Sequence, residues 1–229
     1  MDKATIARLL KLSPAQKLST GNIRTCPVRL SYPHLFVAKA QTGDDGKPGR
    51  EVYSAALLFP LGADISLLRT AAAEVAADKF GPAWAKRNLH SPFRDQDERA
   101  DGDGNLPSGY ASGAIFMNVN ANRDYPPGVR LRDMQPAKPS DIYPGCWAIV
   151  TLRPYAFDTP KKKGVSFGLQ NVMKLCDDER LGGGGVAAAD KEFAPIDAHR
   201  HHVLPLAGML AGPHLPARKA AVQIGRAHV

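Results

Sequence analysis

Three side chains spaced two residues apart can bind an unpaired nucleic-acid strand. Arg153, Tyr155 and Phe157 share one face of any β-strand that they form, because successive side chains of a strand point to opposite faces. An unpaired strand offers phosphates, which basic side chains bind, and bases, each of which stacks on an aromatic ring for about 1–3 kcal/mol. The residue types and their spacing therefore predict a surface that binds single strands without reading their sequence.

The residues that follow supply more of the same chemistry. Lys161, Lys162 and Lys163 lie in a basic turn, and Phe167 lies on the strand that returns from it. Two interpretations stay open for the aromatic side chains, which can stack on bases or fill the protein core. For the lysines, contact with nucleic acid is favoured over the alternative that they only solubilise the tip of a hairpin.

A second group of residues, within positions 92–123, can contact phosphates or base edges. Arg94 and Arg123 are its basic members, and we include both in the predicted interface. Its other members are Pro92, Phe93, Tyr110, Asn118, Asn120 and Asn122. Amide and guanidinium groups hydrogen-bond to phosphates and to base edges. The same residue types also cap turns, so a structural role stays open for this group.

The evidence for catalysis in the sequence is weak. The phosphate-cradling motif GxxxxGK[ST] is missing. Acidic pairs at 95/97 and 101/103 can bind a divalent ion of the kind that nucleases use, but no strand is expected to hold them in place. His199, His201 and His202 lie in a stretch without periodicity. We therefore expect no enzymatic activity, no metal and no cofactor.

Composition restricts the class of protein and its partners. The chain has 229 residues, with 30 Lys and Arg against 22 Asp and Glu, and its net charge of +8 favours polyanionic partners. Cys26, Cys146 and Cys176 form no CxxC pair, so we expect reduced thiols. The sequence has no apolar run of the length that crosses a membrane and no signal-peptide pattern. We expect a soluble protein of the cytoplasm.

Hydrophobic periodicity predicts several strands and one helix. An apolar stripe at helical spacing indicates a helix that begins near Asp64 or Ser66 and ends before Gly81. A long loop is expected over 88–113, and strands are expected at 28–38, 51–59, 114–120, 145–157 and 165–175. Because βαβ alternation is missing, the pattern predicts a mainly-β fold, an OB-fold-like Greek-key barrel with one packed α-helix and long loops.

The chain is expected to have three parts. Residues 1–20 form an N-terminal arm, residues 21–181 form the OB-fold domain that binds single-stranded DNA, and residues 182–229 form a flexible tail. The tail begins with a run of four glycines, and the chain after Phe193 carries five of the seven histidines.

Several ordered segments resemble the OB-fold single-stranded-DNA-binding family of tailed phages, long described as a domain of unknown function. They are residues 22–36, 53–60, 92–95, 142–146, 154–155 and 164–172. The resemblance covers roughly residues 20 to 193. It implies an OB-fold with added elements, DNA binding that tolerates any sequence, homodimers, and a role in phage DNA replication, recombination or repair in the cytoplasm of the host cell.

The C-terminal residues depart from this resemblance. It implies an acidic tail that recruits phage replication proteins, whereas the stretch after Phe193 has Asp197 as its single acid. The last six residues, 224–229, also read like a translated sequencing adapter. We therefore expect that residues 194–229 are aberrant and that an acidic tail is missing.

The sequence thus predicts a protein that binds single-stranded DNA by contacting the phosphate backbone and the bases of the DNA. A phage structural or assembly protein with an incidental basic surface is the alternative, and a metal-dependent nuclease comes third.

Overall fold

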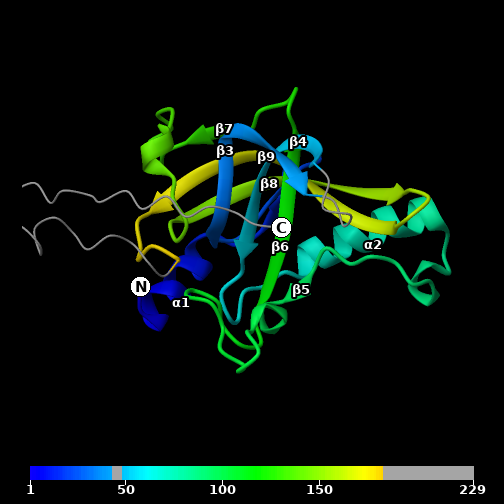
Figure 1. The fold of residues 1–229 in the computed structure, drawn as a ribbon, viewed down its shortest axis with the longest axis horizontal. Helices are drawn as coiled ribbons and strands as arrows, with labels where there is room; N and C mark the ends of the chain where they lie inside the picture. The colour runs from blue at the N-terminus through cyan, green and yellow to red at the C-terminus, as the bar shows by residue number, and fades with distance from the viewer. Residues whose placement is uncertain (43–47, 183–229) are drawn as a thin grey trace, which may run out of the picture. The chain divides into compact units, whose positions relative to one another are not determined.

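The structure is a computed structural model, and it describes residues 1–42 and 48–182 (Figure 1). The predicted tail, residues 182–229, lies outside the described residues except for Gly182. The helices and strands are α1 (Lys3–Leu12), β1 (Gln16–Lys17), β2 (Ile23–Arg24), β3 (Val28–Thr42), β4 (Pro48–Leu58), α2 (Ser66–Phe80), β5 (Arg94–Asp95), β6 (Ile115–Asn122), β7 (Gly128–Arg130), β8 (Trp147–Asp158) and β9 (Lys163–Cys176). Three short 3₁₀-helices join them, η1 (Trp84–Lys86), η2 (Gln96–Arg99) and η3 (Pro139–Asp141).

Five of the described strands close a ring in the order β8, β3, β4, β6, β9. Neighbours in the ring are antiparallel except β6 and β9, which are parallel. A five-stranded Greek-key ring is the architecture of an OB-fold barrel. The mainly-β, OB-fold-like barrel that the sequence predicts is therefore confirmed.

Helix α2 is the packed helix that the apolar stripe predicts. Its buried residues are Leu68, Ala71, Ala72, Ala76 and Phe80. The Asp64 carboxylate accepts a hydrogen bond from the Ser66 amide at 2.9 Å, and Gly81, at φ 81°, ends the helix. The helix lies between β4 and β6 in sequence and packs against β8 and β9 (Figure 1). A second described helix, α1, has no buried residue.

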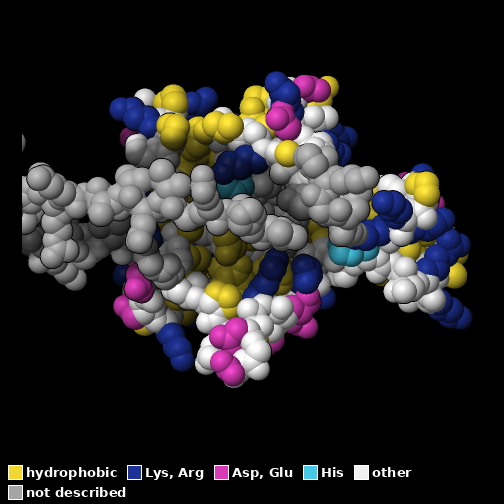
Figure 2. All heavy atoms as spheres, in the orientation of Figure 1, with side chains coloured by type: hydrophobic (Ala, Val, Ile, Leu, Met, Phe, Trp, Pro, Cys, Tyr) yellow, Lys and Arg dark blue, Asp and Glu magenta, His cyan; other side chains and the backbone are white. Residues whose placement is uncertain are grey.

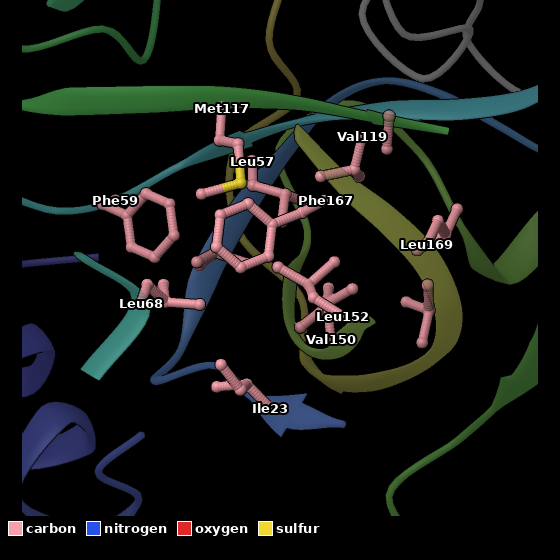
Figure 3. Packing of buried hydrophobic residues seen from close by; sticks show 14 of the residues in the cluster. Ile23, Leu57, Phe59, Leu68, Met117, Val119, Val150, Leu152, Phe167 and Leu169 are labelled. Carbon is pink, nitrogen blue, oxygen red and sulfur yellow. The ribbon is translucent and has the colours of Figure 1, made fainter. Parts of the chain in front are cut away.

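The barrel core is made of aliphatic and aromatic side chains from every strand of the ring. Phe59, Leu68, Met117 and Phe167 meet at its centre (Figure 3). Each fully buried side chain of this size stabilises the fold by roughly 1.5–3 kcal/mol. Burial also raises the pKa of the Cys26 thiol to about 11, so this cysteine remains a protonated core residue.

The segment predicted as a long loop, residues 88–113, contains β5 and η2. The reason is the buried side chain of Gln96, whose amide nitrogen donates to the Phe59 and Ile115 carbonyls at 3.1 and 2.8 Å. Its oxygen accepts from the Ala111 amide at 2.8 Å. A single glutamine therefore ties the segment to the barrel. No helix in the described part of the chain is long and apolar enough to cross a membrane.

Candidate nucleic-acid interface

Arg153, Tyr155 and Phe157 lie on one face of β8, as their spacing predicts. The residues opposite them on β9 are small, because the register pairs them with Gly168, Ser166 and Gly164 in that order. Side chains opposite each other in an antiparallel pair are about 5 Å apart, so large partners here would cover the guanidinium group and the rings. The small residues on β9 therefore form the floor of a depression beside the three large side chains of β8.

Closure of the barrel adds β6 to the same surface. Gly168 pairs with Arg153 on β8 and with Asn120 on β6, so the three strands lie side by side. Adjacent strands are about 4.8 Å apart, which places the backbones of Asn120 and Arg153 roughly 10 Å from each other. The groove that results has a volume of about 880 Å³. Its lining residues are Gln41, Arg50, His90, Asn120, Ala121, Asn122, Tyr125, Arg153, Tyr155, Phe157, Thr159, Lys162, Ser166, Gly168, Leu169 and Gln170.

The groove is basic. None of the described residues that line it is acidic. Two acids nearby are paired with cations: Glu51 lies 2.6 Å from Arg123, and Asp158 lies 3.1 Å from Lys163. Within residues 1–42 and 48–182 no salt bridge to Arg153 is recorded. Lys and Arg side chains gather over the β8–β9 hairpin and the nearby end of α2, at the right of Figure 2.

Aromatic rings follow one another along the groove. The ring of Tyr155, which is 37% exposed, lies 6.5 Å from that of Phe157, and Phe157 lies 6.1 Å from the His90 imidazole. The backbone of His90 is held against the hairpin by hydrogen bonds to Lys163 and Val165. Gly164 permits this close approach, since a Cβ there would lie 2.5 Å from the His90 carbonyl oxygen. The series of aromatic rings is therefore formed by two segments that lie far apart in the chain.

The structure brings four of the predicted site residues into the groove: Arg153, Tyr155, Phe157 and Lys162. Lys161 and Lys163 lie exposed in the adjoining turn. Phe167 is different, because its side chain has no exposed surface and its ring packs edge-on against Phe93 at 6.0 Å. A base cannot reach this ring in the structure. Of the two interpretations of Phe167, stacking on a base or filling the core, the structure supports the second.

Neither Arg94 nor Arg123 lines the groove. Arg94 is paired with Glu98 and lies 5.1 Å over the Phe116 ring. Its strand pairs with β6 four residues away from Asn120, about 13 Å along that strand. Arg123 directly follows the lining residue Asn122 and is paired with Glu51 at the rim. The predicted contacts at these two arginines therefore lie outside the groove.

Sequence reasoning placed Asn120 and Asn122 in a separate, weaker group and did not single out His90, Arg50 or Gln41. The two asparagines carry a usable signal, because they alternate on one strand and so share a face. His90, Arg50 and Gln41 come from other elements. Only the closed barrel brings them to β8, and nothing in their local sequence indicates that.

The acidic pairs considered for metal binding cap turns. Asp97 accepts from the Gly113 amide at 2.8 Å, and hydrogen bonds from Gly113 and Ser112 lower its pKa. Asp101 accepts from the amides of Asp103 and Asn105 at 3.0 and 2.8 Å. Among the described residues no group of three or more His, Cys, Asp or Glu could hold a metal ion.

Residues 164–168 read GxSxG, the pattern of a hydrolase nucleophile elbow. That motif needs a sharp turn between a strand and a helix, which exposes the serine. Here the five residues lie inside β9, with Ser166 paired across from Tyr155. The serine therefore belongs to the floor of the groove.

Comparison with known proteins gives one family and a set of related structures. The family model described as Enterobacter phage Enc34, ssDNA-binding protein, matches residues 19–203. A solved structure of the single-stranded DNA-binding protein from bacteriophage Enc34 in complex with ssDNA is 24% identical, with a TM-score of 0.57, and covers 73% of this chain and 93% of that one. A second structure of the Enc34 protein is 22% identical, with a TM-score of 0.52, and covers 78% and 94%. A comparison with curated protein sequences gives no match.

Proposed function

The chain belongs to the Enterobacter phage Enc34 ssDNA-binding protein family, and from this membership and the groove we propose that it binds single-stranded DNA without sequence specificity. The observation that carries the proposal is the groove itself. It combines basic side chains, aromatic rings and a lining without acids among its described residues. Basic side chains and aromatic rings are the two parts that a sequence-tolerant single-strand site needs.

Each part of the groove has a distinct role in this proposal. Arg50, Arg153 and Lys162 neutralise phosphates, so binding releases counterions. Tyr155 and Phe157 stack on bases, and every base has a π-face, so the contact tolerates any sequence. The side-chain amides of Asn120, Asn122 and Gln170 lie in the same groove and can bond to base edges of either donor or acceptor character.

The rings give the proposal its preference for single strands. In a duplex the faces of the bases are covered by their neighbours in the stack, and only their edges are accessible in the grooves. A ring such as Tyr155 can stack only on a base whose face is free. A duplex would therefore keep the phosphate contacts and lose the stacking.

The biological setting that the sequence predicts belongs to the same proposal. Family membership supports a role in phage DNA replication, recombination or repair, in the cytoplasm of the host cell. The homodimer and the phage replication proteins stay predictions. Light scattering of the purified chain tests the dimer, and a mass of one protomer at micromolar concentration contradicts it.

The experiment that tests the function is fluorescence anisotropy with the full chain. A labelled oligo-dT and a duplex of equal length are titrated at several salt concentrations. We expect tight binding of the single strand, weaker binding of the duplex, and a logarithm of the affinity that falls linearly with the logarithm of salt. Absent binding, or equal binding of both forms, contradicts the proposal and favours the phage structural or assembly protein.

A further inference from the structure

A second, smaller cavity adjoins the groove on the side of α2. We call it the side pocket. It has a volume of about 230 Å³, and its lining includes Arg69, Trp84, Leu89, His90, Phe93 and Val165. His90 lines both the groove and the side pocket. The two cavities therefore meet at this residue, where the segment before β5 pairs in parallel with the start of β9. Figure 1 shows this segment running back from the end of α2 to β5.

The side pocket has two aromatic side chains and a cation on its surface. Trp84 and Phe93 are half-buried, so each packs against the core with one part and lines the cavity with another. The Arg69 guanidinium lies 4.9 Å above the centre of the Phe93 ring. In the part of the chain that the structure describes, no salt bridge to Arg69 is recorded.

We propose that the side pocket holds one unstacked base of the strand that occupies the groove. The inference rests on the proposed function and deepens it, because it extends the DNA path past the hairpin onto α2 and η1. The aromatic series Tyr155, Phe157 and His90 runs along the groove to the residue that borders the side pocket. A strand that stacks along this series arrives at the side pocket next.

The size and the charge of the side pocket fit this occupant. Pockets for drug-sized ligands measure about 300–1,000 Å³, so a cavity below that range suits a single small ring system. Trp84 provides a stacking surface, Phe93 an apolar wall that Arg69 covers on one face, and Arg69 can bind the phosphate of the same nucleotide. The exposed residues Lys86 and Arg87, at the end of η1, add positive charge beside the cavity. An anionic strand is the ligand that this combination attracts.

Intrinsic fluorescence gives the first test, because the chain has only two tryptophans. Trp147 is 2% exposed and donates its Nε1–H to Asp178 at 2.7 Å, so DNA cannot stack on it. We expect unlabelled oligo-dT to quench the emission of the wild-type chain and to leave the emission of Trp84→Phe unchanged. Binding by anisotropy without quenching, or equal quenching in Trp84→Phe, overturns the side pocket as a base site.

Affinity gives the second test. Trp84→Leu is expected to weaken binding of a long oligo-dT by about 5- to 150-fold, the range for one lost stacking contact, while Trp84→Phe keeps most of the affinity. Arg69→Gln removes a phosphate contact and is also expected to weaken binding. Arg99→Gln is the matched control, since Arg99 is also exposed and lies 5.0 Å over a ring, that of Phe116, away from the groove. Loss of the same charge there should leave the affinity unchanged. Equal affinity of Arg69→Gln and Arg99→Gln overturns the proposal.

Oligonucleotides with one abasic position separate stacking from folding effects. In the wild-type chain one position beyond those that occupy the groove should lower the affinity when its base is missing, and in Trp84→Leu that position should have no effect. Unchanged sensitivity in the variant contradicts the side pocket. If the wild-type chain binds no oligonucleotide at all, the proposed function fails. If it binds normally and none of these changes occurs, only the side pocket fails.

Discussion

Each end of strand β8 has an arginine next to an aromatic ring, but the two arginines differ in their partners within the fold. At the groove end, Arg153 lies beside Tyr155 with no recorded salt bridge among the described residues. At the other end, about 26 Å along the strand from Tyr155, Arg29 lies beside Trp147 and is bound by groups of the fold. Its guanidinium donates to the Gly145 and Glu179 carbonyls at 3.0 and 2.5 Å.

Asp178 is the centre of this second end. Its carboxylate accepts from Trp147 Nε1 at 2.7 Å and from the Met1 ammonium at 2.6 Å, and lies 3.9 Å from Arg29. Burial by itself would raise the pKa of this carboxyl, but the hydrogen bonds from the ammonium group and Trp147 outweigh it and lower the pKa to about 2. Lys174 and Tyr143 are likewise bound to the neighbouring Asp177, at 2.6 and 2.7 Å.

A basic and aromatic cluster can either stabilise the fold or bind a ligand, depending on the partners of its cations. At the Asp178 end Arg29, Lys174 and the Met1 ammonium each have a carboxylate or carbonyl partner within the fold, so the cluster stabilises the protein. In the groove the Tyr155 ring is exposed and the Phe157 ring is half-buried, and Arg153 has no acidic partner among the described residues, so the same residue types can bind a ligand. The comparison holds only if mutations at one end change stability and mutations at the other change DNA binding.

The largest expected effect is on stability, from Asp178→Ala. The substitution leaves Trp147 Nε1 without its acceptor and removes the carboxylate that pairs with the Met1 ammonium and Arg29 in a largely buried site. We expect a loss of about 3 kcal/mol in the free energy of unfolding. Urea denaturation measures it. Asp158→Ala, which breaks the exposed pair with Lys163, is the control and should cost less than about 1 kcal/mol. A similar loss in both variants would remove the distinction between the ends.

The second largest effect is expected from the loss of base stacking at Tyr155. Tyr155→Leu should weaken single-strand binding by about 1–3 kcal/mol and change the stability little, because its side chain is 37% exposed. Phe167→Leu, in the paired strand, should do the reverse, since that ring is fully buried. Anisotropy and urea denaturation on the same two samples give both quantities. If Phe167→Leu weakened binding as much as Tyr155→Leu at equal stability, the assignment of Phe167 to the core would be wrong.

These two rings also show where sequence reasoning ends. Alternation places Tyr155 and Phe157 on one face, and it places Phe167 on one face of β9, but it does not say which face is inside. The register decides this: Ser166 lies opposite Tyr155, so Phe167 lies opposite Pro154 and points to the core. A shift of one residue in the hairpin would reverse the outcome.

The strands of the barrel and α2 could be predicted because their signals are local. Helical spacing marks α2, and a short apolar run marks the first half of β8. The part of the site that lies beyond β8 could not be predicted, because it forms only when the barrel closes. The parallel pair Asn120–Gly168 and the bridge His90–Gly164 join residues that no local pattern relates. Arg94 illustrates the same limit, since its sequence neighbours do not indicate that its strand joins β6 outside the groove.

A smaller effect is expected for the phosphate contacts. Arg153→Gln should reduce the slope of log affinity against log salt by about 0.7, the value for one phosphate of a single strand. Arg94→Gln removes the same charge outside the groove, where Arg94 is already paired with Glu98, and should leave the slope unchanged. Anisotropy titrations at four or more salt concentrations give both slopes. Equal slopes in the two variants would mean that long-range charge alone attracts the DNA.

The smallest effect concerns pH and tests the Asp178 end alone. A carboxyl whose pKa is lower in the folded state than in the unfolded state stabilises the fold above the unfolded value, and this contribution is lost as the pH falls through the folded value. For Asp178 the window runs from its ordinary pKa, near 3.8, down to about 2. Other lowered carboxyls, such as Asp97 and Asp101, lose their contributions on acidification as well. Urea denaturation at several pH values should therefore show a shallower decline for Asp178→Asn than for the wild-type chain. Parallel declines would mean that Asp178 has no such linkage, and the pairing that distinguishes its end from the groove would lose its energetic support.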